Sequence, residues 1–347
     1  MNKKPICIGT GLVALDVILN GSPTASPKLS AGGSCGNVLS ILGYLGWNSF
    51  PIARLADDQA GVELISDLLR WNVQTNHITN DADGSTPIII HRILKDKQGM
   101  PAHRFEFRDP DTKTWLPQFK GITKNIASEI IQEKPLPQLF YFDRMNPGTF
   151  ELATYFKSKG SIIYFEPSSS KDIKQFEKFL ALADIIKFSH DRIPDYRNQY
   201  TSSQCLLEII TYGQNGLVYR SKKYSKPNHW NTMKSFTINN IQDAAGAGDW
   251  CTSGIIDKLC SAGISGLMKK TANDIELALE FGQELGALNC LFDGARGLMY
   301  YYSFDDLITL INSFNKKRSV TEKNIFTVPR IDISSKIKFS ELYYLAK

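Results

Sequence analysis

The chain has 347 residues, and its composition, with 42% hydrophobic and 22% charged residues, is that of an ordinary globular protein. The net charge of +5 comes from scattered lysines and arginines, so the sequence shows neither the basic tract of a nucleic-acid binder nor an apolar run long enough for a membrane span. The six cysteines form no CxxC pair and no zinc-spaced cluster, and no apolar signal region follows the N-terminus, so a cytoplasmic protein with free thiols is expected.

The first predicted strand ends in the turn Gly9-Thr10-Gly11, and the apolar stretch that follows contains Asp16. A buried carboxylate needs a partner, which leaves open a structural salt bridge or a ligand hydroxyl for Asp16. The pair Gly32 and Gly33 then precedes an apolar helix and allows close approach to the backbone. Asn37 opens this helix and is either a cap or a ligand contact.

The pattern of apolar and polar side chains in residues 83–118 differs from that in the rest of the chain. Their alternation of apolar and polar side chains is typical of an exposed antiparallel hairpin with one wet face. Together with strands from about residues 11–34, this hairpin is expected to form a small β lid that excludes water from a site beneath it. Exposed lid strands can also pair between subunits, which leaves a homodimer open.

From residue 120 onward, strands and helices alternate regularly. This rhythm predicts the α/β class: one three-layer α/β/α domain over 1–347 with a mostly parallel central sheet. Residues 319–347 have no firm pattern and are expected to form a C-terminal extension, and a short strand is expected over 235–238. Ligands bind beyond the carboxyl ends of such strands. Four predicted strand ends carry polar or glycine residues that can face one crevice: Asp143, Glu166, Lys187 and Gly213.

The most informative stretch is Asp243-Ala244-Ala245-Gly246-Ala247-Gly248-Asp249, which comes directly before an apolar helical run. A helix start leaves backbone N–H groups without partners, and tiny residues let a phosphate oxygen reach them. A carboxylate at Asp249 can take the proton of a hydroxyl there. The motif therefore favours phosphoryl transfer, although a tight turn with Asp249 as a helix cap is the alternative that this segment alone leaves open.

These features resemble the ribokinase, or PfkB-type, carbohydrate kinase family over roughly residues 5–315. Residues 243–249 are similar to the family's Asp-Thr-x-Gly-Ala-Gly-Asp signature, and Ala31-Gly32-Gly33 with Asn37 is similar to its Gly-Gly signature. The resemblance implies a ribokinase-like fold and an ATP-dependent kinase, with Mg²⁺ carried on the ATP, that phosphorylates a sugar such as ribose or fructose. A nucleoside kinase, or a non-catalytic sugar or nucleotide sensor, remains the alternative.

The resemblance also assigns roles to positions. Asp249 would be the general base, and the N–H groups of Gly246, Ala247 and Gly248 would hold the transferring phosphoryl group. The sugar would be bound by Asp16, Gly32, Gly33 and Asn37. The nucleotide would lie along Lys187, Thr211, Gly213, Gly216 and Gln283, although Lys187 could instead be a surface charge. A loop for a monovalent cation, with K⁺ as its ion, would comprise Asp243, Ala245, Asn289, Phe292 and Gly294. One departure is that Ser189-His190-Asp191-Arg192 stands where the family has Asn-x-x-Glu.

Overall fold

The computed structural model describes residues 3–19, 26–80, 82–95, 101–226, 229–315, 326–337 and 339–343. Within them, the main sheet has the strand order β13 (Asn231–Met233), β12 (Leu217–Ser221), β11 (Leu207–Thr211), β10 (Ile185–Ser189), β9 (Ile162–Phe165), β8 (Leu139–Phe142), β1 (Ile6–Thr10), β4 (Asn48–Leu55), β5 (Ile78–Asn80). The strands from β11 to β5 are parallel, and β12 and β13 are antiparallel to their neighbours. The prediction of an α/β fold with a mostly parallel sheet is confirmed.

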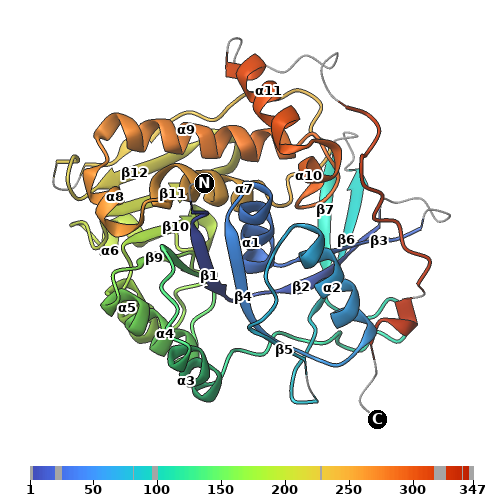
Figure 1. Ribbon diagram of the computed structural model, residues 1–347. Helices are drawn as coiled ribbons and strands as arrows, with labels where there is room; N and C mark the ends of the chain where they lie inside the picture. The colour runs from blue at the N-terminus through green and yellow to red at the C-terminus, as the bar shows by residue number, and fades with distance from the viewer. Residues whose placement is uncertain are drawn as a thin grey trace.

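Helices cover both faces of this sheet (Figure 1). One core holds the apolar side chains of α1 (Ser34–Tyr44), α2 (Gln59–Arg70), α7 (Ala247–Cys260), α8 (Gly263–Lys269), α9 (Ala272–Asn289), α10 (Gly297–Tyr301) and α11 (Phe304–Asn315). The other core holds those of α3 (Lys124–Gln132), α4 (Pro147–Ser158), α5 (Ile173–Leu180) and α6 (Tyr196–Gln199). In β8, Leu139 and Tyr141 enter the first core while Phe140 and Phe142 enter the second. Because strand side chains alternate in direction, this pattern makes three layers.

The helices differ in whether a side chain caps their first turn. Helices α2, α4, α5 and α9 begin where a side-chain oxygen accepts a hydrogen bond from a first-turn N–H, as Asp58 does from Gly61 at the start of α2. Helices α1 and α7 instead begin at Gly33 and Gly246, with no side-chain cap. Their first N–H groups are therefore left for other acceptors.

A second, smaller sheet has the order β3 (Lys28–Gly32), β2 (Ala14–Leu19), β6 (Ile88–Lys95), β7 (Pro101–Glu106). Strand β2 pairs parallel to β6, and the other two pairings are antiparallel. All four strands fall within the ranges 11–34 and 83–118 that the sequence predicts for a lid; residues 20–25 and 96–100 of those ranges lie outside the described residues.

The described part of the C-terminal extension lies along the outer edge of β3. The N–H of Leu29 donates to the carbonyl oxygen of Ile333 (3.0 Å), and the N–H of Ala60 at α2 donates to that of Leu342 (2.8 Å). The hydroxyl of Tyr343 donates to Asp109, beyond the end of β7. Of the predicted extension, residues 319–325, 338 and 344–347 lie outside the described residues. The segment thus connects the small sheet to α2.

Two details of the predicted strands are wrong. No strand forms over 235–238; instead β13 ends at Met233, which pairs with Leu217, the first residue of β12. Residues after Met233 run past the start of β12 and have no strand to pair with. Lys187 lies in the middle of β10 rather than at its end, so it is buried rather than a surface charge. Among the described residues, no helix is both long and apolar enough to cross a membrane.

Leu342 of the C-terminal segment is only 1% exposed, so we expect truncation of its side chain to destabilise the folded state strongly. Removing most of its side chain leaves a cavity, so Leu342→Ala should lower the free energy of unfolding by about 2–5 kcal/mol in urea denaturation. The matched control is Val328→Ala, because Val328 is 74% exposed in the same segment and should change stability by less than about 0.5 kcal/mol. Equal effects of the two variants would contradict the docked position.

Candidate active site

The start of α7 forms a cradle of backbone N–H groups. Gly246 has a φ of 73°, and a Cβ on it would come within 2.0 Å of the carbonyl oxygen of Ala295, so only glycine fits. Within the described residues, the N–H groups of Gly246 and Gly248 have no hydrogen-bond partner, and that of Ala247 reaches the carbonyl oxygen of Ala244 only at 3.4 Å. Together with the helix dipole, these groups can bind an anion such as a phosphate.

The carboxylate of Asp249 lies in the first turn of α7, beside this cradle. Asn37, in the first turn of α1, donates a hydrogen bond from Nδ2 to Asp249 Oδ2 at 2.7 Å. Burial and, to a smaller extent, the nearby carboxylate of Glu166 raise the pKa of Asp249, the Asn37 hydrogen bond and Lys187 lower it, and the net result is a pKa of about 7. Asp249 is thus oriented by Asn37 and has a pKa suited to a general base near neutral pH.

A buried ion pair lies directly beneath the cradle. Lys187 Nζ donates to Glu166 Oε1 (2.9 Å) and to the carbonyl oxygen of Gly248 (3.1 Å). The other Glu166 oxygen accepts from the hydroxyls of Thr252 (2.7 Å) and Tyr141 (3.2 Å). Burial by itself would lower the pKa of Lys187, but the Glu166 carboxylate raises it above its ordinary value, so the ammonium stays charged. Lys187 therefore fixes the loop that the sequence predicts to contact phosphate.

Asp16 lies in β2 and faces Gly32 of β3. A Cβ on Gly32 would come within 2.1 Å of the Asp16 carboxyl carbon, so the glycine makes room for this carboxylate. Burial raises the pKa of Asp16 to about 7, and Arg296 acts against that rise. Among the described residues, no hydrogen bond or ion pair satisfies the Asp16 carboxylate. Of the two interpretations left open by the sequence, this geometry favours a ligand hydroxyl over a salt bridge.

Asp16 and Asp249 both lie beside the same short stretch of chain, residues 32–37. Gly32 ends β3, Gly33 begins α1, and Asn37 follows in the first turn of that helix. The structure therefore brings the predicted sugar-binding residues and the predicted base together around the start of α1.

The predicted nucleotide residues, apart from Lys187, gather at another place, the carboxyl end of β11. Thr211 ends this strand, and residues 213–215 form a short 3₁₀ turn closed by a hydrogen bond from the N–H of Tyr212 to the carbonyl oxygen of Gly216 (2.8 Å). Gln283 of α9 donates to the carbonyl oxygen of Lys234 (3.3 Å), one residue after β13, which pairs beside this turn.

The residues of the predicted cation loop also meet in space. Asp243 accepts hydrogen bonds from the N–H groups of Ala245 (3.0 Å) and Gly294 (2.9 Å). Asn289 donates from its side-chain nitrogen to the carbonyl oxygens of the same two residues. The ring of Phe292 packs instead against aromatic neighbours in α10 and just after it. The loop thus links the segment 243–249 to the end of α9.

Three further features near the site were not predicted from the sequence. Thr252 supports Glu166 and could have been noticed because it lies one helical turn after Asp249. His91 of β6 forms a buried pair with Asp243, with 3.4 Å between Nε2 and Oδ2. Arg296 pairs with Asp67 of α2, and the two are 229 residues apart in the chain, a contact that no local pattern reveals.

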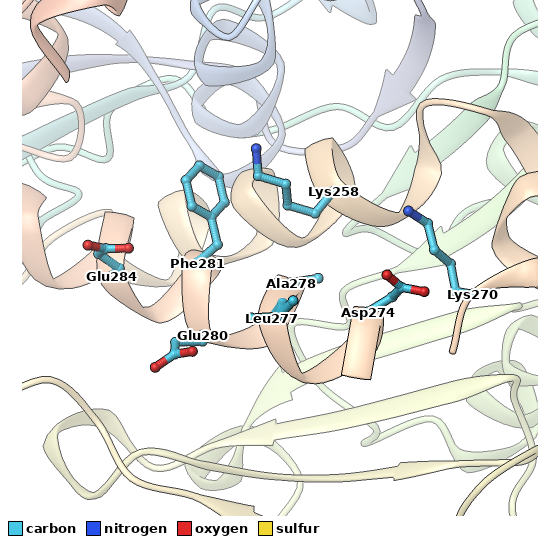
Figure 2. Close-up of a pocket in the computed structure, with 8 residues that line it drawn as sticks. All are labelled: Lys258, Lys270, Asp274, Leu277, Ala278, Glu280, Phe281 and Glu284. Carbon is cyan, nitrogen blue, oxygen red and sulfur yellow. The ribbon is translucent and has the colours of Figure 1, made fainter. Parts of the chain in front are cut away.

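A surface hollow of about 350 Å³ lies between α7 and α9, away from these residues (Figure 2). Its lining is mixed: charged side chains of both signs surround the ring of Phe281, and the ammonium of Lys258 lies 4.1 Å from that ring. None of the predicted site residues lines it.

Comparison with known proteins shows the family and the fold of the chain. The sequence profile described as "pfkB family carbohydrate kinase" matches residues 10–299. A fructokinase of Escherichia coli is 25% identical over 307 residues, which covers 81% of this chain and 92% of that protein.

Solved structures share the fold. The fructokinase of Xylella fastidiosa with bound ATP superposes with a TM-score of 0.67 at 17% identity, covering 90% of this chain and 100% of that one. A double mutant of the fructokinase of Vibrio cholerae O395, in a form with fructose, ADP and potassium ion bound, gives a TM-score of 0.64 at 19% identity and covers 86% and 96%.

The raised pKa of Asp249 predicts how stability depends on pH. The folded state holds the Asp249 proton up to about pH 7, whereas the unfolded chain releases it near pH 4, so the charged form destabilises the fold at alkaline pH. Asp249→Asn should therefore be more stable than the wild type at pH 8, by on the order of 2–4 kcal/mol, and the gain should fade as the pH falls from 7 to 4.

Urea unfolding between pH 4 and pH 9 measures this difference. Asp111→Asn, which changes an exposed carboxylate, serves as the control and should follow the wild type at every pH. A stability gain for Asp249→Asn that did not depend on pH would show that charge at this position is not its source.

Proposed function

The chain belongs to the pfkB family of carbohydrate kinases and is a sugar kinase, and on that premise we propose that it transfers the γ-phosphoryl group of ATP to a hydroxyl of a small sugar such as fructose or ribose, with Asp249 as the general base. The observation that carries the proposal is the Asp249 carboxylate, held by Asn37, beside the N–H groups of Gly246 and Gly248, which have no hydrogen-bond partner in the described part of the chain. A base and an anion cradle at one place are what phosphoryl transfer to an alcohol requires.

On the sugar side, Asp16 accepts hydrogen bonds from substrate hydroxyls and fixes the orientation of the ring. Among the residues that the structure describes, its buried carboxylate has no hydrogen-bond or ion-pair partner, so a bound polyol would satisfy it. The hydroxyl to be phosphorylated then points to Asp249, which removes its proton as the new P–O bond forms. Gly32 leaves room for the Asp16 carboxylate and Gly33 for the backbone of Leu12, so the two glycines allow the chain to pass close beside this acceptor.

On the nucleotide side, ATP lies over the carboxyl ends of β10 and β11, with its base near Gln283 and its phosphates directed to the start of α7. The N–H groups of residues 246–248 hold the γ-phosphoryl group during transfer. Mg²⁺ bound to the ATP phosphates would neutralise part of their charge, with the Asp249 carboxylate beside it. Glu166 would not hold this cation, because Lys187, Thr252 and Tyr141 already bind its two oxygens.

The small sheet acts as a lid in this proposal and as the surface for a homodimer. The outer edge of β3 is already lined by residues 333–335, whereas β7 is the opposite edge strand. Phe105 and Phe107 are 44% and 45% exposed beside that edge, so copies would pair there, which light scattering measures.

We place the protein in the cytoplasm, since all six cysteines are buried free thiols. A structure of the Vibrio cholerae fructokinase contains a bound potassium ion. In this chain, the loop expected to take a monovalent cation is the one that contains Asn289 and Gly294.

A coupled ADP-release assay against sugars, sugar phosphates and nucleosides tests the proposal. The wild type should release ADP with a small sugar, and Asp249→Asn should lower turnover by about 10²- to 10⁴-fold, because the hydroxyl then loses its base. ADP binding, followed by calorimetry, should be kept in the variant. Turnover only with nucleosides would redirect the proposal to a nucleoside kinase, and no turnover with intact ATP binding would favour a sensor.

The role of Asp16 is tested by the nearly isosteric change Asp16→Asn. A hydrogen bond to a charged acceptor contributes about 1.5–3 kcal/mol, so KM for the sugar should rise by about 10- to 100-fold while KM for ATP stays unchanged. Steady-state kinetics with each substrate varied in turn separates the two constants. A rise in KM for ATP alone would remove Asp16 from the sugar site.

A further inference from the structure

The side chain of Asn289 occupies the centre of the predicted cation loop. It is fully buried at the end of α9, and its Nδ2 lies 3.0 Å from the carbonyl oxygen of Ala245, 3.3 Å from that of Gly294 and 3.2 Å from that of Ala295. Three carbonyl oxygens from two separate loops thus point at one nitrogen atom.

A fourth hydrogen bond fixes which way the Asn289 amide points. Its Oδ1 accepts from the N–H of Leu298 at 3.1 Å. If the amide were turned over, Oδ1 would face three carbonyl oxygens and Nδ2 would face an N–H donor, so every contact would be repulsive. The orientation with the NH₂ group among the carbonyls is therefore the only one that satisfies these partners.

A ring of converging carbonyl oxygens is the kind of site that takes the place of the hydration shell of K⁺. Left without an ion or a donor, such oxygens repel one another and remain buried without partners. Here the two amide hydrogens of Asn289, which carry partial positive charge, are shared among the three carbonyl oxygens. The neighbouring Asp243 carboxylate is also engaged, by the N–H groups of Ala245 and Gly294 and by His91. The residues present therefore do not fit a monovalent cation, because its place is filled from within.

The hydrogen bonds of Asn289 affect the anion cradle through the backbone. Ala245 directly precedes Gly246, and the carbonyl oxygen of Ala295 packs so closely on Gly246 that no Cβ could fit. The bonds of Asn289 to Ala245 and Ala295 thus set the position of the Gly246 N–H from both sides.

We propose that the Asn289 carboxamide replaces a monovalent cation as the brace of the anion cradle, so that catalysis by this kinase is independent of K⁺. Asn289 is a positioning residue, since it acts through the backbone of Ala245 and Ala295. The inference rests on the proposed kinase function for its effect on turnover, but its structural part can be measured without a substrate.

The test compares KCl with choline chloride at equal ionic strength. For the wild type, the melting temperature and kcat should be the same in both salts, with less than about a twofold change in kcat. Asn289→Ala should lose about 10- to 100-fold in kcat in choline chloride, because the cradle is displaced, with little change in KM for the sugar. KCl should restore much of this loss and raise the melting temperature of the variant, because K⁺ enters the vacated ring of carbonyls.

Asn198→Ala, which changes an exposed asparagine of α6, is the matched control and should resemble the wild type in both salts. If Asn289→Ala does not fold, Asn289→Ser takes its place, and the wild-type comparison decides independently of either variant. Activation or thermal stabilisation of the wild type specifically by K⁺ would overturn the proposal. So would a folded Asn289→Ala protein with full activity in choline chloride, or one that KCl neither reactivates nor stabilises. The melting temperatures remain informative even if no sugar is turned over, so failure of the kinase assignment would be distinguishable.

Discussion

The site depends on one buried ion pair, Lys187 with Glu166. Taking both charges out of water is costly, and such a pair is retained only when further hydrogen bonds satisfy its remaining atoms. Here those bonds come from Thr252 and Tyr141 to the carboxylate and from the ammonium to the carbonyl oxygen of Gly248. The bond to Gly248 ties the first turn of α7 to the middle of the sheet, beside the N–H groups that we propose to bind phosphate.

The same charges act on the pKa of Asp249, the proposed base. Burial favours the neutral form of Asp249 most and the nearby Glu166 carboxylate adds to that effect, whereas the Asn37 amide and Lys187 counteract it. The balance leaves the Asp249 pKa near neutrality rather than near its ordinary value. A carboxyl group with a pKa near 7 is a stronger base than an exposed aspartate, and it is ionised in about half of the molecules near pH 7.

A second set of contacts braces the cradle from the opposite side. Asp243 and Asn289 each bind both the segment before α7 and the loop after α9, so the two loops move as one unit. His91 extends the brace to β6 of the small sheet through its contact with Asp243. A lid strand is thereby in contact with the anion cradle, which offers a direct route by which lid position and cradle geometry influence each other.

The sequence by itself determined the fold class, the glycine-rich start of α7 with Asp249, and the glycine pair Gly32-Gly33 before α1. The periodicity of strands and helices depends on a few neighbouring residues, and so do the free N–H groups of a helix start. The local sequence is therefore enough to predict them. Only the tertiary structure decided that Asn37 orients Asp249, that Lys187 is buried against Glu166, and that Asn289 fills the ring of carbonyls. These partners are 212, 21 and, for Asn289 with Ala245, 44 residues apart. Which buried polar groups satisfy one another depends on how the layers pack, and no pattern along the chain specifies that.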